Sequence, residues 1–309
     1  MKRHLILGFF LCLPLAAQAW NATGHRVVAL LAWQQLAPDA RQQLIQLLSA
    51  HPEFADWRQK AGLDDPALLL AEAAVWPDTL RHDRRYYDER TSTCDSAPKE
   101  SCPQPIPGLP DQAQHRPWHY VDIDSRGNRL AGEVDRQIPR LSAELRYAQD
   151  PARVAYAIPW LLHLVADIHQ PLHVGNGEDE GGNSLVADNP FDKESKPGTL
   201  HRLWDNLGGP SRLRGQKLWA RAQTLLAHHP APAAGDVLHW REESRALHAT
   251  VYASVPQAGS GVFVPDMDYM NKAQATADQQ LVHAGYRLGW LLAQSLKQRV
   301  SHGTRLTPP

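Results

Sequence analysis

Apolar residues recur every three or four positions through most of the chain, which is the spacing of one face of an α-helix. This pattern predicts helices over residues 27–36, 41–48, 66–75, 133–147, 152–169, 200–206, 211–228, 237–252 and 272–300. No run of alternating apolar and polar residues is long enough to predict a β-strand. We therefore expect an all-α fold. The sequence shows no internal repeat and no linker, which predicts a single domain.

Two stretches interrupt the helical pattern. Residues 81–118 contain Cys94, Cys102, six prolines and few apolar runs, which predicts a long surface excursion. A loop of this length within a compact domain is usually functional. Residues 175–198 are rich in glycine, aspartate and asparagine and predict a second loop. Pro139 and Pro159 lie within predicted helices, where each either belongs to a first turn or introduces a kink.

The first nineteen residues have the pattern of a secretory signal peptide. Lys2 and Arg3 precede an apolar run over residues 5–15, which is too short to span a membrane. Residues 17–19 then supply a small-x-small cleavage pattern that is typical of bacterial signals. We therefore expect residues 1–19 to be removed and residues 20–309 to form one exported domain, periplasmic or secreted, with Trp20 as its first residue and no membrane association.

The charge of the chain is nearly balanced. Lysine and arginine total 32, aspartate and glutamate total 33, and the formal charge of −1 becomes −3 when Lys2 and Arg3 leave with the signal peptide. This balance argues against a broad basic surface for duplex DNA. It does not exclude a nucleic-acid substrate, because bound metal ions add positive charge that a count of residues omits.

Cys94 and Cys102 are the cysteines that remain after removal of the signal peptide, which contains Cys12. In an oxidising compartment two cysteines at this separation predict a local disulfide. The alternative is a pair of soft metal ligands, and it is weaker because no further cysteine exists to complete a thiolate site.

The chemistry of the chain is concentrated in the segment from His163 to His173. His163 and Asp167 are four residues apart, so on a helix they share a face and can hold one ion. Pro171 interrupts this helix and would bring His173 back from another direction. Asp167 has two oxygens and could bridge two ions. Imidazole and carboxylate are the ligands of zinc where thiolates are absent, so we predict a multinuclear metal site.

Four further stretches have the composition of metal ligands. They are Trp20 to His25, the pair Asp78 and Arg81, the segment Trp118 to Asp122, and the pair His201 and Asp205, which repeats the His-xxx-Asp spacing. Each alone has an ordinary structural explanation, such as an ion pair, a helix cap or a buried histidine. Two His-xxx-Asp pairs in one exported helical chain favour the metal hypothesis.

The ordered motifs W-x4-H, W-x-D-x-x-R, W-H-Y-x-D, H-x3-D-x-H-Q-P-L-H, G-G-N and H-x3-D run from Trp20 to Asp205. In this order they resemble the zinc-dependent, single-strand-specific nucleases of the S-one/P-one type, also called 3′-nucleotidases. The resemblance implies a single helical domain of the kind shared with zinc-dependent phospholipase C. It also implies hydrolysis of single-stranded DNA and RNA to 5′-phosphorylated products, with 3′-nucleotides as further substrates and no stable protein partner.

The resemblance further implies three Zn²⁺ ions. One would be held by Asp78, His119, His163 and Asp167, and a second by His173, His201 and Asp205. The third would take the α-amino group and carbonyl of Trp20 together with His25 and the other oxygen of Asp167. An amine acylated by a preceding residue is an amide and cannot act as this ligand. Removal of the signal peptide would therefore complete the site.

The resemblance also assigns the residues that would contact substrate. Besides holding zinc, Asp78 belongs to the catalytic pair with Arg81, whose guanidinium would neutralise the phosphate in the transition state. Tyr120 would stack on an unpaired base. Asp122 and Asn183 would hydrogen-bond the base edge.

Two alternatives compete with the nuclease hypothesis. Zinc-dependent phospholipase C is similar in its helical fold and N-terminal tryptophan ligand, but its last helix pair is typically His-xxx-Glu, where this chain has His201 and Asp205. A zinc-binding protein without catalysis would leave Arg81, Asp122 and Asn183 without a role.

Overall fold

The computed structural model describes residues 20–62, 65–92, 94, 102–191, 197–256, 259 and 261–306. The predicted signal peptide lies outside these residues. Among them, none of the helices combines the length and the apolar character that crossing a membrane requires.

Helices dominate the described chain, which confirms the all-α prediction. The α-helices are α1 (Ala22–Gln35), α2 (Pro38–Leu48), α3 (Phe54–Lys60), α4 (Pro66–Ala73), α5 (Trp76–Thr79), α6 (Val134–Tyr147), α7 (Pro151–Asp167), α8 (Leu200–Asp205), α9 (Gly215–His228), α10 (Val237–Ala246), α11 (His248–Val251) and α12 (Met267–Leu306). Short 3-10 helices are η1 (Leu80–His82), η2 (Arg116–His119), η3 (Pro171–His173) and η4 (Asn206–Gly208). The sequence pattern missed α3, and the helix expected over residues 237–252 is divided into α10 and α11.

Short strands are also present, which the sequence pattern did not predict. A three-stranded sheet has the order β2 (Arg129–Gly132), β1 (Val121–Ile123) and β3 (Val174–Gly175), and β4 (Val186–Ala187) pairs with β5 (Gly198–Thr199). Strands of two to four residues are too short to display alternation. β1 and β3 are parallel, with Val121 opposite Val174. Since β1 follows η2 and β3 follows η3, this pairing brings the ends of two distant segments together.

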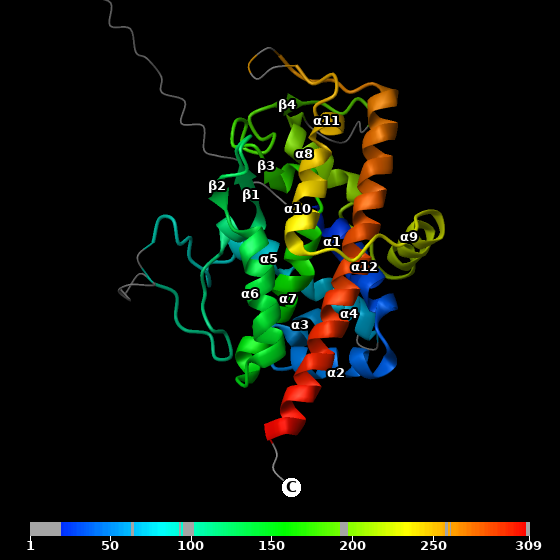
Figure 1. Ribbon diagram of the computed structural model, residues 1–309. Helices are drawn as coiled ribbons and strands as arrows, with labels where there is room; N and C mark the ends of the chain where they lie inside the picture. The colour runs from blue at the N-terminus through cyan, green and yellow to red at the C-terminus, as the bar shows by residue number, and fades with distance from the viewer. Residues whose placement is uncertain are drawn as a thin grey trace, which may run out of the picture.

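The helix α7 forms the centre of the hydrophobic core. Every residue from Val154 to Asp167 is buried, and α6 packs along one side of it (Figure 1). Asp150 caps the start of α7 by accepting a hydrogen bond from the Ala152 amide. α12 runs the length of the molecule and packs against α1, α6 and α7 (Figure 1).

The contact between α1 and α12 depends on a glycine. A Cβ atom at Gly285 would lie 2.3 Å from Cβ of Leu31, so a larger residue would force the two helices apart. Because α1 carries His25 and α7 carries His163 and Asp167, this packing determines how the ligand candidates meet.

Candidate metal centre and substrate cleft

The C-terminal end of α7 supplies the first two side chains of the site. His163 Nε2 lies 3.3 Å from Asp167 Oδ2, and both residues are fully buried. His163 Nδ1 lies 2.9 Å from the carbonyl oxygen of Ala74, directly after α4. If Nδ1 donates this hydrogen bond, Nε2 carries the lone pair that a metal ion would accept.

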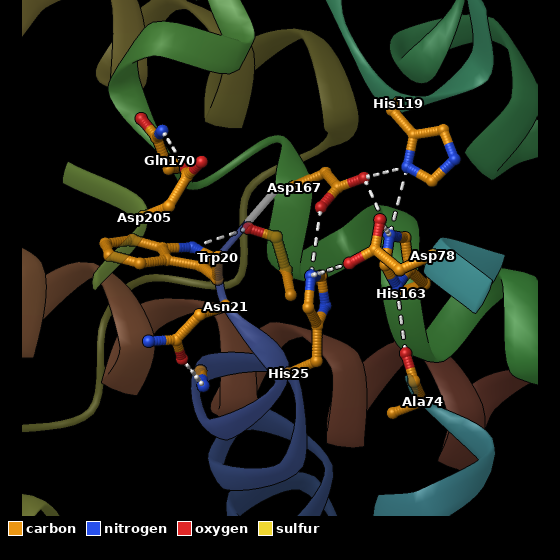
Figure 2. A network of polar contacts seen from close by, with 12 residues as sticks. Trp20, Asn21, His25, Ala74, Asp78, His119, His163, Asp167, Gln170 and Asp205 are labelled. Atoms are coloured by element: carbon orange, nitrogen blue, oxygen red, sulfur yellow. Dashed lines mark hydrogen bonds and ion pairs between the residues drawn. The ribbon is translucent and has the colours of Figure 1, made fainter. Parts of the chain in front are cut away.

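Side chains from three other segments surround Asp167 (Figure 2). His25 of α1 lies 3.5 Å from Asp167 Oδ1, whereas His119 of η2 lies 3.1 Å from Asp167 Oδ2. Asp78 of α5 lies 3.8 Å from His163 Nε2 and 3.9 Å from His25 Nε2. The two oxygens of Asp167 therefore face different histidines, which is the geometry that a carboxylate bridging two ions requires.

His173, His201 and Asp205 form a separate buried group. His173 Nδ1 lies 2.6 Å from the His119 carbonyl oxygen, and His201 Nδ1 lies 2.6 Å from that of Gly181. With both Nδ1 protons directed at carbonyls, the two Nε2 lone pairs face each other across 3.1 Å. A cation between them would turn this repulsive contact into an attractive one.

Trp20 is fixed between the ends of α7 and α8. Its indole Nε1 donates to the Ala166 carbonyl at 3.0 Å, and the Asn21 amide donates to the Asp205 carbonyl at 3.0 Å. A Cβ atom at Gly24 would lie 2.6 Å from Cβ of Trp20, so only glycine leaves room for the indole. Figure 2 shows Trp20 beside Asp167 and Asp205, where the main chain enters the site.

The electrostatics of the site favour bound cations. Burial raises the pKa of Asp167 and of Asp205 well above the usual range, and repulsion from Asp78 adds to both shifts. Burial likewise lowers the pKa of His25 and His119 well below the usual value. Several buried atoms make no hydrogen bond to the described residues: both ring nitrogens of His25, Asp167 Oδ1 and Asp205 Oδ2. Divalent ions would be coordinated by these carboxylate oxygens and by one ring nitrogen of His25, so the residues fit the metal centre expected from the sequence.

The predicted ligands thus form three groups that could each hold an ion. They are His25, His163 and Asp167; Asp78, His119 and His163; and His173, His201 and Asp205. Cys94 and Cys102 lie apart from these groups and are joined by a disulfide with a Cα–Cα distance of 5.7 Å, as predicted. The role of each residue as a zinc ligand stays a prediction.

A cleft of about 280 Å³ opens beside the metal centre and is lined by His119 and His201 together with Arg81, Tyr120, Asp122 and Asn183. All four predicted substrate contacts therefore face the same space. Arg81 is in contact with the Asp78 carboxylate. Burial raises the pKa of Asp122 to about 6, and the charges of Asp179 and Glu180 add to the shift.

Sequence reasoning missed several residues that the fold brings to the site. Gln170 donates to Asp205 Oδ1 at 2.7 Å and accepts from the Leu172 amide at 2.6 Å, so it links α8 to the turn before His173. Arg90 and Arg116 line the cleft. The only hint of their role was the length of the excursion over residues 81–118.

His169, which had no predicted role as a ligand, is fully buried away from the three groups. Its Nδ1 lies 2.7 Å from the Val165 carbonyl and its Nε2 lies 2.9 Å from Arg287 Nη1. These contacts connect the end of α7 to α12, so His169 has a structural role in joining the two helices.

Several known proteins are similar in sequence to this chain. The family model described as S1/P1 Nuclease matches residues 20–297. The chain is 30% identical over 308 residues to Endonuclease 4 of Arabidopsis thaliana, which covers 93% of this chain and 92% of that protein. It is 27% identical over 208 residues to Endonuclease 1 of Arabidopsis thaliana, covering 65% of this chain and 58% of that protein. It is 23% identical over 206 residues to Nuclease S1 of Aspergillus oryzae, covering 63% of this chain and 56% of that protein.

The alignments to Endonuclease 1 and Nuclease S1 thus span little more than half the length of those proteins. The family match nevertheless begins at Trp20 and includes all three groups of donors and the whole lining of the cleft. By the extent of this match, the chain belongs to the S1/P1 nuclease family.

Proposed function

We propose that this protein is an exported, zinc-dependent endonuclease that hydrolyses single-stranded DNA and RNA to 5′-phosphorylated products and also acts on 3′-nucleotides. One observation carries the proposal: His119 and His201, from two separate donor groups, both line the cleft that contains Arg81 and Tyr120. Metal chemistry and substrate recognition can therefore meet in one space.

Three zinc ions would be held by the ligand sets that the family resemblance implies. Bound zinc lowers the pKa of water and so supplies a nucleophile near neutral pH, and it attracts the oxygens of a phosphodiester. Three carboxylates (Asp78, Asp167 and Asp205) would leave three such ions with a net positive charge. This charge would draw a polyanion to a chain whose own formal charge is −3 once Lys2 and Arg3 have left with the signal peptide.

Arg81 would stabilise the phosphate during the reaction. Its side chain is only 7% exposed, and it contacts Asp78 at the edge of the metal centre while lining the cleft. Arginine remains charged at any working pH and can donate two parallel hydrogen bonds to phosphate oxygens.

The preference for single strands would follow from the base pocket. Tyr120 directly follows the ligand His119, so a base stacked on its ring would place the neighbouring phosphate close to the metal ions. Asp122 and Asn183 would accept and donate hydrogen bonds at the base edge. A base inside a duplex presents neither a free face for stacking nor an unpaired edge.

Export would complete the metal centre. Cleavage after residue 19 would free the α-amino group of Trp20 beside Asp167 and Asp205. The hydrogen bonds of the Trp20 indole and the Asn21 amide would then hold this group in place without help from the metal.

The experiment that tests the proposal combines metal analysis with substrate assays on the purified mature protein. We expect three zinc ions per chain, hydrolysis of single-stranded DNA, RNA and 3′-AMP, and loss of all three activities on chelation. Duplex DNA and phosphatidylcholine serve as comparison substrates. A zinc-loaded protein that cleaved phosphatidylcholine but no nucleic acid would overturn the proposal in favour of a phospholipase.

A further inference from the structure

Two arginines of the cleft have no role in the proposed reaction. Arg90 and Arg116 lie 26 positions apart, near opposite ends of the long excursion, yet both line the cleft beside Arg81 and Tyr120. Their side chains are 49% and 28% exposed, so each is open to a ligand from solvent.

One carboxylate holds both guanidinium groups. Asp88 accepts hydrogen bonds from Arg90 Nε at 2.9 Å and Arg90 Nη2 at 2.7 Å, and it lies 3.4 Å from Arg116 Nε. Arg116 Nε also donates to Gln114 Oε1 at 2.9 Å. Asp88 is the carboxylate that contacts both guanidinium groups, and the charge of the nearby Glu89 also acts on each of them.

The backbone beneath the cluster is fixed by pairing within the excursion. The Tyr87 amide donates to the Gln112 carbonyl at 3.0 Å, and the Gln114 amide donates to the Tyr87 carbonyl at 2.9 Å. The His115 amide donates to the Glu89 carboxylate at 3.2 Å. The arginines therefore stand on a preorganised platform, which reduces the entropy lost when a ligand binds.

The arginines keep donors available for an anion. Among the described residues, none accepts a hydrogen bond from the terminal nitrogens of Arg116. Burial lowers the pKa of Arg116, and the positive charges of Arg90 and Arg81 add to this shift, while the carboxylates of Asp88 and Glu89 oppose it. A phosphate bound beside Arg116 would reduce the repulsion that Arg90 and Arg81 exert on its guanidinium.

The other part of the cleft lining has the opposite charge. Asp122 and Glu180 line it, and the buried Asp179 lies close enough to raise the pKa of Asp122. Carboxylates repel phosphates but accept hydrogen bonds from the amino groups of bases. A nucleotide strand in the cleft would therefore turn its backbone toward the arginines and its base toward the carboxylates.

We infer that Arg90 and Arg116 form a subsite for a second phosphodiester, one nucleotide away from the phosphate that is cleaved. This inference rests on the proposed nuclease function and deepens it. A 3′-mononucleotide has no second phosphate and cannot use the subsite. The pair therefore selects polynucleotides over mononucleotides without taking part in bond cleavage.

The test compares two substrates on one double variant, Arg90→Gln/Arg116→Gln. We expect kcat/KM on a single-stranded decanucleotide to fall about tenfold or more, the size typical for loss of a charged hydrogen bond, while kcat/KM on 3′-AMP stays within about twofold. The Kd of a phosphorothioate decanucleotide, measured by fluorescence anisotropy, should depend less on salt. The slope of log Kd against log salt concentration should decrease by about 0.7 for each phosphate that the variant no longer neutralises.

The control Arg84→Gln/Arg136→Gln removes the same charge from exposed positions outside the cleft lining and should leave both substrates unaffected. Zinc content and melting temperature establish that the variants fold. Unchanged cleavage and binding of the decanucleotide, or equal losses on decanucleotide and 3′-AMP, would overturn the subsite. A wild-type protein that cleaves neither substrate would instead overturn the nuclease function, and the subsite with it.

Discussion

The substitution Asp167→Asn should have opposite effects on the stability of the zinc-loaded and the zinc-free protein. Asp167 is fully buried at the end of α7, with one oxygen 3.5 Å from His25 and the other 3.1 Å from His119 and 3.3 Å from His163. Asparagine keeps the shape of the side chain but removes its charge and replaces one oxygen with an amide nitrogen. It would therefore no longer be able to hold two ions.

The magnitude follows from two opposing effects. A zinc ion present at a hundred times its Kd stabilises the fold by about 2.7 kcal/mol, so loss of the two ions that share Asp167 should cost about 5 kcal/mol. In the zinc-free protein, burial and the repulsion from Asp78 and Asp205 raise the pKa of Asp167. At a pH above the raised pKa, each pKa unit of the shift lowers the free energy of unfolding of the zinc-free protein by about 1.4 kcal/mol. Asparagine, which has no charge to bury, removes this cost.

The sign of the pH dependence follows from the same shift. Because the folded pKa is raised, the ionised carboxylate opposes folding of the zinc-free protein at neutral pH. That opposition disappears as the pH falls and Asp167 binds a proton. The gain in stability from asparagine in the zinc-free state should therefore be largest near pH 8 and shrink in acid.

The assay is a pair of melting curves, with zinc and with a chelator, together with the zinc content per chain. We expect three ions in the wild type and one in Asp167→Asn, with the variant melting below the wild type when loaded and above it when chelated. A change of one kcal/mol in the free energy of unfolding shifts the melting temperature by about 2–4 °C in proteins of roughly this size. Asp78→Asn is the matched control, because Asp78 would hold one ion and its substitution should remove one ion. A chelated Asp167→Asn protein that melted below the chelated wild type would refute the reasoning.

Three further predictions concern the cleft and its support. Arg81→Ala should lower kcat by about 100-fold with zinc content unchanged, and loss of zinc would show a structural role instead. Gln170→Leu removes the hydrogen bond to Asp205 and should weaken zinc binding by about 10- to 100-fold, measured by competition with a chelator; unchanged affinity would contradict it. Asp122→Asn should raise the melting temperature at pH 8 but not at pH 4, because the raised pKa of Asp122, about 6, makes its ionised form unfavourable above that pH. The gain should be about 1 kcal/mol after allowance for solvent screening, and equal gains at both pH values would refute this assignment.

Local spacing was enough to predict much of the helical fold and part of the site. The pair His163 and Asp167 lies on one face of α7 because residues four apart on a helix always do, whatever surrounds them. The ordered motifs from Trp20 to Asp205 identified the family, and the disulfide between Cys94 and Cys102 was predicted and is present. Short elements escaped prediction. α3 has seven residues and the strands have two to four, too few to display a period.

The contacts between the motifs depend on packing across the whole chain. His119 and His173 are 54 positions apart and meet because β1 and β3 pair in parallel, while His25 reaches Asp167 because α1 packs against α7 and α12. Arg90 and Arg116 share Asp88 because the excursion folds back on itself at Tyr87. Backbone geometry sets the distances between residues within a helical turn, so these distances can be predicted from a sequence motif. The distances between segments arise from burial of apolar surface and from which helices fit together, and no local motif contains that information.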